Sequence, residues 1–412
     1  MLLWGGQTVS IAGNGIFMVA LPLEVFRFTS NALDLALVFS AGTLPMVVLL
    51  LFTGALADRV SRRLVMLLSD AVSGLAITLM TVLIVTGQAR LWMLIVLSVV
   101  TGTSLAFFLP ASSAIFRDIL PPELMVSANS LSSLSRGLAQ FMAGPLLGGL
   151  IVAVLGTVWA FGFDAASFLV GVMCLAAMSR IAPRKAADTA NGPQRAGLQL
   201  LAEVRAGLRY CRSQAWLWWS MLAMAVMNFA CFAPIFILEP LLVRHFFGRA
   251  AVALGLIYAA NGAGGTLASL YITWYGAPRK RIAAVWAALS GSGVGAALLG
   301  ISPSIWIAII LAGLLWAAAT YGNILWLATL QEAVPPELLG RVMSLDWLVS
   351  LALTPLGTLA GGALASVAGV RMALVTGGAV AACTGAAVLV SRMREPDRRP
   401  SANVAEPGQA EA

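Results

Sequence analysis

Gly54-Ala-Leu-Ala-Asp-Arg-Val-Ser-Arg-Arg-Leu-Val-Met66 separates two long apolar stretches of the sequence. The preceding run, 35–57, carries no charge, and the chain becomes apolar again directly after Arg63. This pattern predicts that the chain leaves a lipid bilayer, makes a tight charged turn and enters the bilayer again. Short loops rich in Lys and Arg stay on the cytoplasmic side, so Arg59, Arg62 and Arg63 place the turn there.

Asp58 ends the first apolar run with a carboxylate. It is placed to accept hydrogen bonds from the free N–H groups of a neighbouring helix N-terminus, or to pair with an arginine of its own turn. Either contact forms a latch that can be broken and remade. The alternative is that the charges of this turn only anchor the topology.

The composition indicates that lipid is the solvent for most of the chain. Of 412 residues, 60% are hydrophobic and 10% are charged, whereas soluble proteins carry about 25% charged residues. The net charge of +8 lies in short loops between apolar runs, which is typical of membrane topology and argues against a nucleic-acid partner. The scattered cysteines and the single histidine exclude a disulfide framework and a metal site.

Apolar runs of about 20 residues, long enough to span a bilayer, occur twelve times. Breaks near Gly156 and at 302–304 divide two overlong stretches, and nothing shows the alternation of a membrane barrel. The sequence therefore predicts an all-α membrane protein with twelve transmembrane helices. Its expected parts are a six-helix bundle at 1–180, a cytoplasmic linker with an interfacial helix at 181–212, a second six-helix bundle at 213–392 and a disordered cytoplasmic tail at 393–412.

The basic residues are unequally distributed between the two sides. With both termini in the cytoplasm, the inner loops and tail hold 19 Lys and Arg, the outer loops hold five, and Arg136 lies within the membrane. This asymmetry follows the rule that positive loops remain inside. We expect a multi-pass protein of a bacterial-type inner membrane.

An internal repeat relates the two predicted bundles. Pro121-Pro-Glu-Leu124 recurs as Pro335-Pro-Glu-Leu338, and Asn14 recurs as Asn228 at the same offset of 214 residues. Repeats in one orientation predict two pseudo-symmetric halves related by an axis along the membrane normal. The second-half counterpart of the charged turn keeps basic residues but has no acid, so the predicted latch is one-sided.

The charged turn resembles the signature turn between helices 2 and 3 of the major facilitator superfamily, with Ser61 where glycine is usual. The resemblance implies that Gly54 and Asp58 belong to a gating latch, in which the acid holds the start of helix 11 in the outward-facing state. In this sequence Arg341 and Val342 open that helix.

A second motif, Gly144-Pro145-Leu-Leu-Gly148-Gly149, resembles the helix 5 motif of drug–proton antiporters. Asp164-Ala-Ala-Ser-Phe168 is similar to a motif in the branch that includes macrolide-efflux and enterobactin-exporting carriers. We expect Asp164 itself to cap the start of a helix. Helix 4 lacks the arginine that many antiporters of the superfamily use in proton movement.

Few ionisable residues lie inside the predicted helices, where each costs about 2.5–3.5 kcal/mol at the bilayer centre. Arg136 is the deepest, and it either binds an anionic group or has a structural role. Asp346 is its expected partner or an inner gate. Glu24 and Glu239 are alternative protonation sites. For each of them, the other possibility is a solvated carboxylate at the outer rim of the protein.

Polar and aromatic side chains inside apolar helices are expected to line a cavity for bulky amphipathic ligands. The remaining residues of this predicted substrate or proton pathway are Asn14, Asn228, Tyr258, Asn261 and Trp316. 

The sequence contains no catalytic constellation and no Walker loop, so we expect neither an enzyme nor an ATP-driven pump, and no cofactor or metal. The favoured hypothesis is a secondary active transporter that exports drug-like or secondary-metabolite small molecules by proton antiport through alternating access. Its partners are then the small molecule, protons and the lipid bilayer, and we expect a monomer. The alternatives are an exporter or facilitator of siderophores or other anionic metabolites, and a membrane scaffold without transport.

Overall fold

The computed structural model describes residues 2–57, 61–119, 121, 124, 131–178, 205, 207–248 and 250–391. Every long regular element in these ranges is a helix, and twelve helices are long and apolar enough to cross a membrane. The predicted all-α fold with twelve spans is therefore confirmed. The Asp58–Arg59 turn, most of the expected linker and the expected tail lie outside the described residues.

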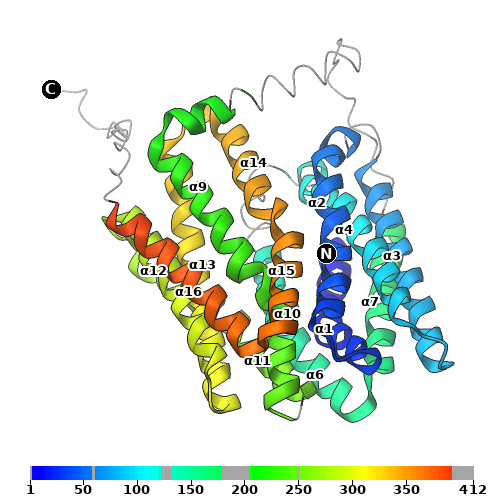
Figure 1. Cartoon of the computed structure of the whole chain (residues 1–412). Coiled ribbons are helices and arrows are strands. Elements are labelled where there is room, and N and C mark those ends of the chain that lie inside the picture. Colours follow the sequence, from blue (N-terminus) through cyan, green and yellow to red (C-terminus); the bar gives the residue numbers. More distant parts are fainter. Residues whose placement is uncertain are drawn as a thin grey trace.

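The first six spans form one side of the molecule, which we call the N half (Figure 1). They are α1 (Leu2–Phe28), α2 (Ala32–Ala57), α3 (Arg62–Val85), α4 (Leu91–Ile119), η2 (Arg136–Ala143) continued by α6 (Gly144–Leu155), and α7 (Thr157–Ala177).

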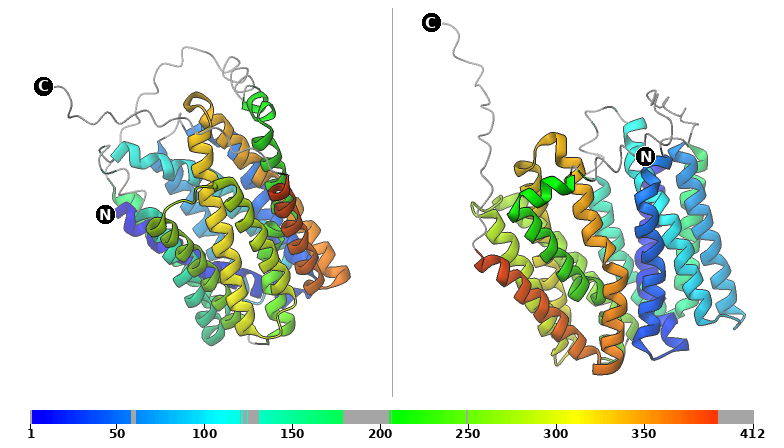
Figure 2. Two further views of the ribbon diagram at one scale, coloured as in Figure 1. Left: turned by 90° about the vertical axis from the view of Figure 1, so that its left-hand side faces the viewer. Right: turned by 45° about the horizontal axis from the view of Figure 1, so that its top comes forward.

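The last six spans form the other side, the C half, and the right-hand view of Figure 2 shows the same division. They are α9 (Ala215–Met227), η3 (Asn228–Phe232) and α10 (Ala233–Phe246) in one span, then α11 (Ala250–Tyr275), α12 (Arg281–Gly300), α13 (Ile305–Ala333), α14 (Pro336–Ala352) with α15 (Thr354–Ala368), and α16 (Val370–Val390).

Consecutive spans run in opposite directions, so the molecule has two distinct ends. We call the end at which α1, α3 and α12 begin the basic end, because Arg62, Arg63 and Arg281 lie there. The other end carries Arg27 and Arg244 and is called the opposite end.

The sequence signals for the helix breaks correspond to real interruptions. Gly156, between α6 and α7, has a φ of +92°, and Gly369, between α15 and α16, has a φ of +86°. Only glycine adopts such angles without strain, so each pair of spans is joined by a single residue. Between α12 and α13, the Ser304 side chain accepts a hydrogen bond from the N–H of Ile307 and caps α13, as the break at 302–304 predicted.

Three spans are irregular at a proline. The π-helical segment η2 ends before Gly144-Pro145, the π-helical segment η3 ends before Ala233-Pro234, and α15 restarts at Thr354-Pro355 after α14. Proline has no N–H to donate and its ring clashes with the carbonyl of the preceding turn, so the helix widens or restarts there. The segments beyond these prolines, α6, α10 and α15, run toward the opposite end.

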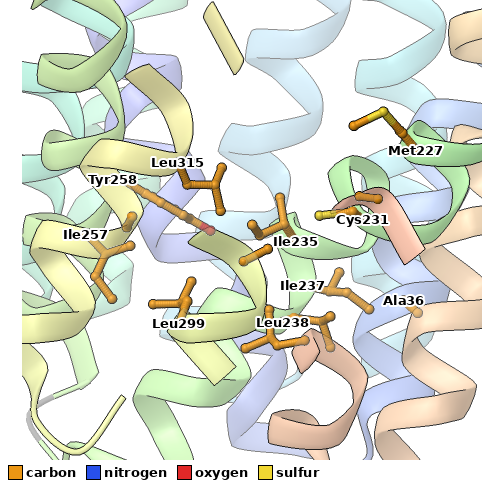
Figure 3. Packing of buried hydrophobic residues seen from close by; sticks show 14 of the residues in the cluster. Ala36, Met227, Cys231, Ile235, Ile237, Leu238, Ile257, Tyr258, Leu299 and Leu315 are labelled. Carbon is orange, nitrogen blue, oxygen red and sulfur yellow. The ribbon is translucent and has the colours of Figure 1, made fainter. Parts of the chain in front are cut away.

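The two halves share one buried apolar cluster. Figure 3 shows Ile235, Ile237 and Leu238 of α10 within it, with Ala36 of α2 on one side and Tyr258 of α11 on the other. On the outside, large apolar side chains are exposed along the spans, as expected for helices whose surroundings are lipid.

Candidate functional site

At the opposite end, the two halves touch backbone to backbone. A Cβ atom on Gly149 of α6 would lie 2.7 Å from the carbonyl oxygen of Ala251 and 3.1 Å from the Cα of Gly255, both on α11. A Cβ atom on Gly362 of α15 would lie 2.5 Å from the Cβ of Ala36 on α2. No side chain fits at either glycine unless the helices move apart, so these contacts close the opposite end.

Polar contacts reinforce this closure. The Arg244 guanidinium of α10 donates to the Thr29 carbonyl oxygen over 2.8 Å and stacks 4.5 Å from the centre of the Phe26 ring. The Ser40 hydroxyl of α2 donates to the Pro355 carbonyl oxygen of α15 over 3.0 Å. Sequence reasoning did not identify these residues, because the contacts join segments more than 200 residues apart.

The glycines of the helix 5 motif pack in two directions. Cβ atoms on Gly144 and Gly148 would lie 2.8 and 2.9 Å from the Cα atoms of Gly15 and Ile16 on α1, whereas Gly149 faces α11. The motif thus joins α6 to its own half and to the other half at once. Its local role in this structure is close helix packing.

Between these closed contacts and the basic end, the described residues enclose several cavities. The mouth cavity, of about 510 Å³, includes Trp4, Gln7, Ser112, Ser133 and Arg136 in its wall. The N-half cavity, of about 470 Å³, includes Asn14, Asp70, Ser98, Arg136 and Gln140. The interfacial cavity, of about 460 Å³, is lined by both halves and includes Met18, Phe141, Phe236, Tyr258, Asn261 and Trp316.

Arg136 faces the hollow interior, as predicted. It opens the π-helical segment η2 and lines both the mouth cavity and the N-half cavity. The ion pairs between described residues are Arg27–Glu24 and Arg281–Glu332, so Arg136 has no carboxylate partner among them. The expected pairing with Asp346 is wrong, because the Asp346 carboxylate accepts instead from the Trp326 indole N–H over 3.1 Å.

Asp164 is not a helix cap. The helix α7 begins at Thr157, two turns earlier, and Asp164 is fully buried where α7 packs on α1. A Cβ atom on Gly13 would lie 2.7 Å from its Oδ1, so glycine at position 13 makes room for the carboxylate. The sequence pattern failed here because the helix starts at the break after Gly156.

Glu24 and Glu239, the two predicted protonation sites, are both buried but have different partners. The Glu24 carboxylate pairs with Arg27, 3.1 Å away, and accepts a hydrogen bond from the Thr157 hydroxyl. The Glu239 carboxylate accepts from the Asn261 amide nitrogen, 3.2 and 3.1 Å from its two oxygens, and has no cation partner among the described residues.

The interfacial cavity contains three of the predicted pathway residues. Tyr258, Asn261 and Trp316 line it, and the Trp316 ring lies 5.7 Å from that of Phe236. Asn228 lies elsewhere, in η3, where its Oδ1 accepts from the Thr354 hydroxyl over 3.4 Å. The repeat partners Asn14 and Asn228 therefore have different surroundings.

Arg63, at the basic end, makes structural contacts. The Arg63 guanidinium donates to the carbonyl oxygens of Leu175 and Ala176 over 2.7 and 2.8 Å, which satisfies the last carbonyls of α7. A Cβ atom on Gly207, in the short helical stretch 207–213, would lie 3.2 Å from the Cβ of Arg341. The end of the expected interfacial helix thus packs on α14.

The predicted latch cannot be traced through its acid, because Asp58 and Arg59 lie outside the described residues, as does the side-chain environment of Gly54. Cys211 lies in the described linker stretch 207–213, close to Asp346 of α14. Burial, and secondarily the Asp346 carboxylate, raises the pKa of the Cys211 thiol to about 11, so the thiol stays protonated at neutral pH.

The family model described as transmembrane secretion effector, within the major facilitator superfamily, matches residues 1–411. The chain belongs to this family. It is 28% identical over 363 residues to the multidrug efflux pump Tap of Mycolicibacterium fortuitum, covering 85% of each chain. It is 22% identical over 359 residues to macrolide efflux protein A of Streptococcus pyogenes, covering 87% of each chain.

Solved structures agree with this assignment at the level of the fold. The transporter is similar, with a TM-score of 0.71 and 15% identity, to a bacterial homologue of the human lysosomal transporter Spinster in an inward-facing and occupied conformation. The similarity covers 97% of this chain and 98% of that one. The predicted superfamily and its efflux branch are confirmed, and the protein is a multi-pass membrane transporter of small molecules.

Proposed function

We propose that this transporter exports bulky amphipathic, drug-like molecules by proton antiport through alternating access. The observation that carries the proposal is the interfacial cavity, which both halves line and which close glycine contacts separate from the opposite end. Its aromatic wall, with Tyr258, Trp316 and Phe236, suits large apolar ligands. The names of the relatives, a multidrug pump and a macrolide efflux protein, support this class of cargo.

The proposal includes an orientation. The basic end faces the cytoplasm of a bacterial inner membrane, because the excess of Lys and Arg lies in the loops of that end. Both termini are then cytoplasmic, and the structure is closed toward the outside. Cargo enters the cavities from the cytoplasm and leaves when the opposite end opens.

Glu239 is the proton site that the geometry favours. A buried carboxylate is costly when charged unless it is paired, and Glu239 has no cation partner among the described residues. The groups that face it are two neutral donors, the Asn261 amide and the Trp316 indole N–H. A group in such surroundings gains and loses a proton with a change of access. Glu24 is less suited, because Arg27 stabilises its charge.

A direct test is a dye and drug panel in an efflux-deficient bacterium that expresses the wild-type protein. Efflux that slows when an uncoupler collapses the proton gradient supports antiport, and efflux that the uncoupler leaves unchanged contradicts it. The panel includes anionic compounds, because Arg136 lines two cavities without a carboxylate partner among the described residues. Preference for these compounds would favour the second hypothesis, an exporter of anionic metabolites.

The Asp58 latch remains a prediction with its own test. If the acid holds the start of helix 11 in the outward-facing state, Asp58→Asn will reduce the efflux rate while leaving the amount of protein in the membrane unchanged. Loss of one charge-assisted contact corresponds to about 1.5–3 kcal/mol, or roughly tenfold or more in rate. Wild-type rates in Asp58→Asn would show that the turn is only a topology anchor.

Arg244 is expected to stabilise the form that is closed at the opposite end. Arg244→Ala removes a hydrogen bond from a charged donor and a cation–π contact, which together favour closure by about 2–3 kcal/mol. The variant should therefore be labelled faster at a Thr29→Cys site by a membrane-impermeant maleimide added outside. Arg90→Ala, at the same end between α3 and α4, provides the control, and equal labelling of both variants would contradict the prediction.

A further inference from the structure

Asn261 separates the interfacial cavity from the carboxylate of Glu239. Its amide nitrogen lies 3.2 and 3.1 Å from the two oxygens of that carboxylate. Asn261 lines the interfacial cavity, whereas Glu239 is only 1% exposed and is not part of the lining. A cargo molecule in the cavity can therefore contact the amide but not the carboxylate behind it.

The Oδ1 oxygen of the same Asn261 amide is buried and has no hydrogen-bond partner among the described residues. Native structures leave few buried acceptors in this condition, because an unpaired one is costly. The buried indole nitrogen of Trp316, which lines the same cavity, faces the Glu239 carboxylate. A ligand that donates a hydrogen bond would satisfy the Asn261 oxygen.

The surroundings of Glu239 contain no competing charge. The titratable side chains that face it are Tyr258 of α11 and Cys231 of η3, and both are ordinarily neutral. The two ion pairs between described residues are at Glu24 and Glu332. Two neutral donors face the carboxylate, the Asn261 amide and the Trp316 indole N–H. The indole can only donate, so of these two groups only Asn261 can accept a hydrogen bond from protonated Glu239.

The two protonation states of Glu239 require opposite faces of this partner. A carboxylate only accepts hydrogen bonds, whereas a carboxylic acid also donates one. When Glu239 is ionised, the amide turns its NH₂ group to it, as in the structure, and its oxygen is left without a partner beside the cavity. When Glu239 is protonated, the O–H needs an acceptor, which the Asn261 oxygen supplies after half a turn of the amide. The NH₂ group then faces the cavity.

We propose that Asn261 couples cargo to the proton by presenting an acceptor to the cavity when Glu239 is ionised and a donor when Glu239 is protonated. The cargo it selects carries a hydrogen-bond donor, such as an amine or a hydroxyl. Such a cargo binds the ionised form, and by reciprocity its binding promotes release of the proton. This inference rests on the proposed proton antiport, and Asn261 acts as a positioning residue within it.

Two aromatic cations distinguish this role from simple attraction of charge. Ethidium carries amine donors, and tetraphenylphosphonium carries none. Asn261→Leu should weaken binding of ethidium to the purified full-length protein at alkaline pH by about tenfold, the value of one hydrogen bond to a buried group. Binding of tetraphenylphosphonium should change by less than about twofold. Asn261→Gln, which keeps both amide functions, should recover part of the ethidium affinity.

Infrared difference spectra test the coupling directly. The protonated-carboxyl band of Glu239 is identified by its loss in Glu239→Gln. At constant pH, ethidium should reduce this band in the wild type but not in Asn261→Leu. Thr320→Val, which alters the same cavity away from Glu239, is the matched control and should keep the ethidium-induced change even where affinity shifts. Asn261→Ala serves as the second variant if the leucine variant does not fold.

The inference is overturned if Asn261→Leu or Asn261→Ala keeps the ethidium-induced change, if both cations are weakened alike, or if the wild type shows no such change. Failure of the proposed function has a different signature. Uncoupler-sensitive efflux by the wild type supports antiport even where Asn261→Leu behaves as the wild type. Efflux that is insensitive to the uncoupler removes antiport itself.

Discussion

Replacement of Gly149 by valine is expected to abolish export. The new side chain would meet the backbone of Ala251 and Gly255 on α11, and neither backbone can give way as a flexible side chain could. Overpacking of this kind costs about 1–3 kcal/mol, so the equilibrium should shift roughly 5- to 150-fold toward the form that is open at the opposite end. Export fails because the transporter no longer returns to the form that loads from the cytoplasm.

The measurement combines dye efflux with labelling of a Thr29→Cys site from outside. Gly149→Val should lose efflux and label faster, because the opposite end stays open. Gly291→Val is the matched control, since Gly291 lies on α12 and no atom lies within 4 Å of a Cβ placed there. Normal efflux by Gly149→Val would show that the helix contact at this end is not required for the transport cycle.

Replacement of Glu239 by glutamine is expected to abolish concentrative export while leaving downhill movement of cargo. Glutamine keeps the size of the side chain and, like the protonated acid, both donates and accepts hydrogen bonds, but it cannot exchange a proton with either side. Each charge that crosses the membrane is worth about 2.3 kcal/mol per 100 mV, so a carrier that loses one coupled proton loses roughly a 50-fold gradient. The readout is dye accumulation in proteoliposomes under an imposed proton gradient.

Glu24→Gln is the control for this prediction. Glu24 is equally buried but is paired with Arg27, so its replacement should weaken the opposite end without uncoupling transport from the proton gradient. If Glu24→Gln stops gradient-driven accumulation and Glu239→Gln does not, the proton site has been assigned to the wrong half of the molecule.

The fold could be predicted from the sequence because lipid imposes simple requirements on it. Each span needs its length of apolar residues, and glycine, serine and proline mark where one span ends and the next begins, as at Gly156 and at 302–304. These requirements are local, so single residues and their neighbours in the chain were sufficient to find them.

The site could be predicted only in part, because its chemistry depends on contacts between distant segments. Tyr258, Asn261 and Trp316 were identified as polar or aromatic residues in apolar helices, and they line one cavity. Glu24 and Glu239 differ in their partners, since Glu24 pairs with Arg27 and Glu239 accepts from Asn261. Asn261 is 22 residues from Glu239 in the chain and lies on another helix. Asp164 was misread because α7 begins two turns earlier, after Gly156, so the carboxylate packs against Gly13 of α1 instead of capping a helix.

The three proline interruptions have a consequence for how cargo leaves. The residues that seal the exit, Gly149, Arg244 and Gly362, all lie on the segments that follow these prolines. A helix that already lacks a backbone hydrogen bond bends at that point with little additional loss. In the proposed orientation, the exit can thus open by bending of these three segments at their prolines.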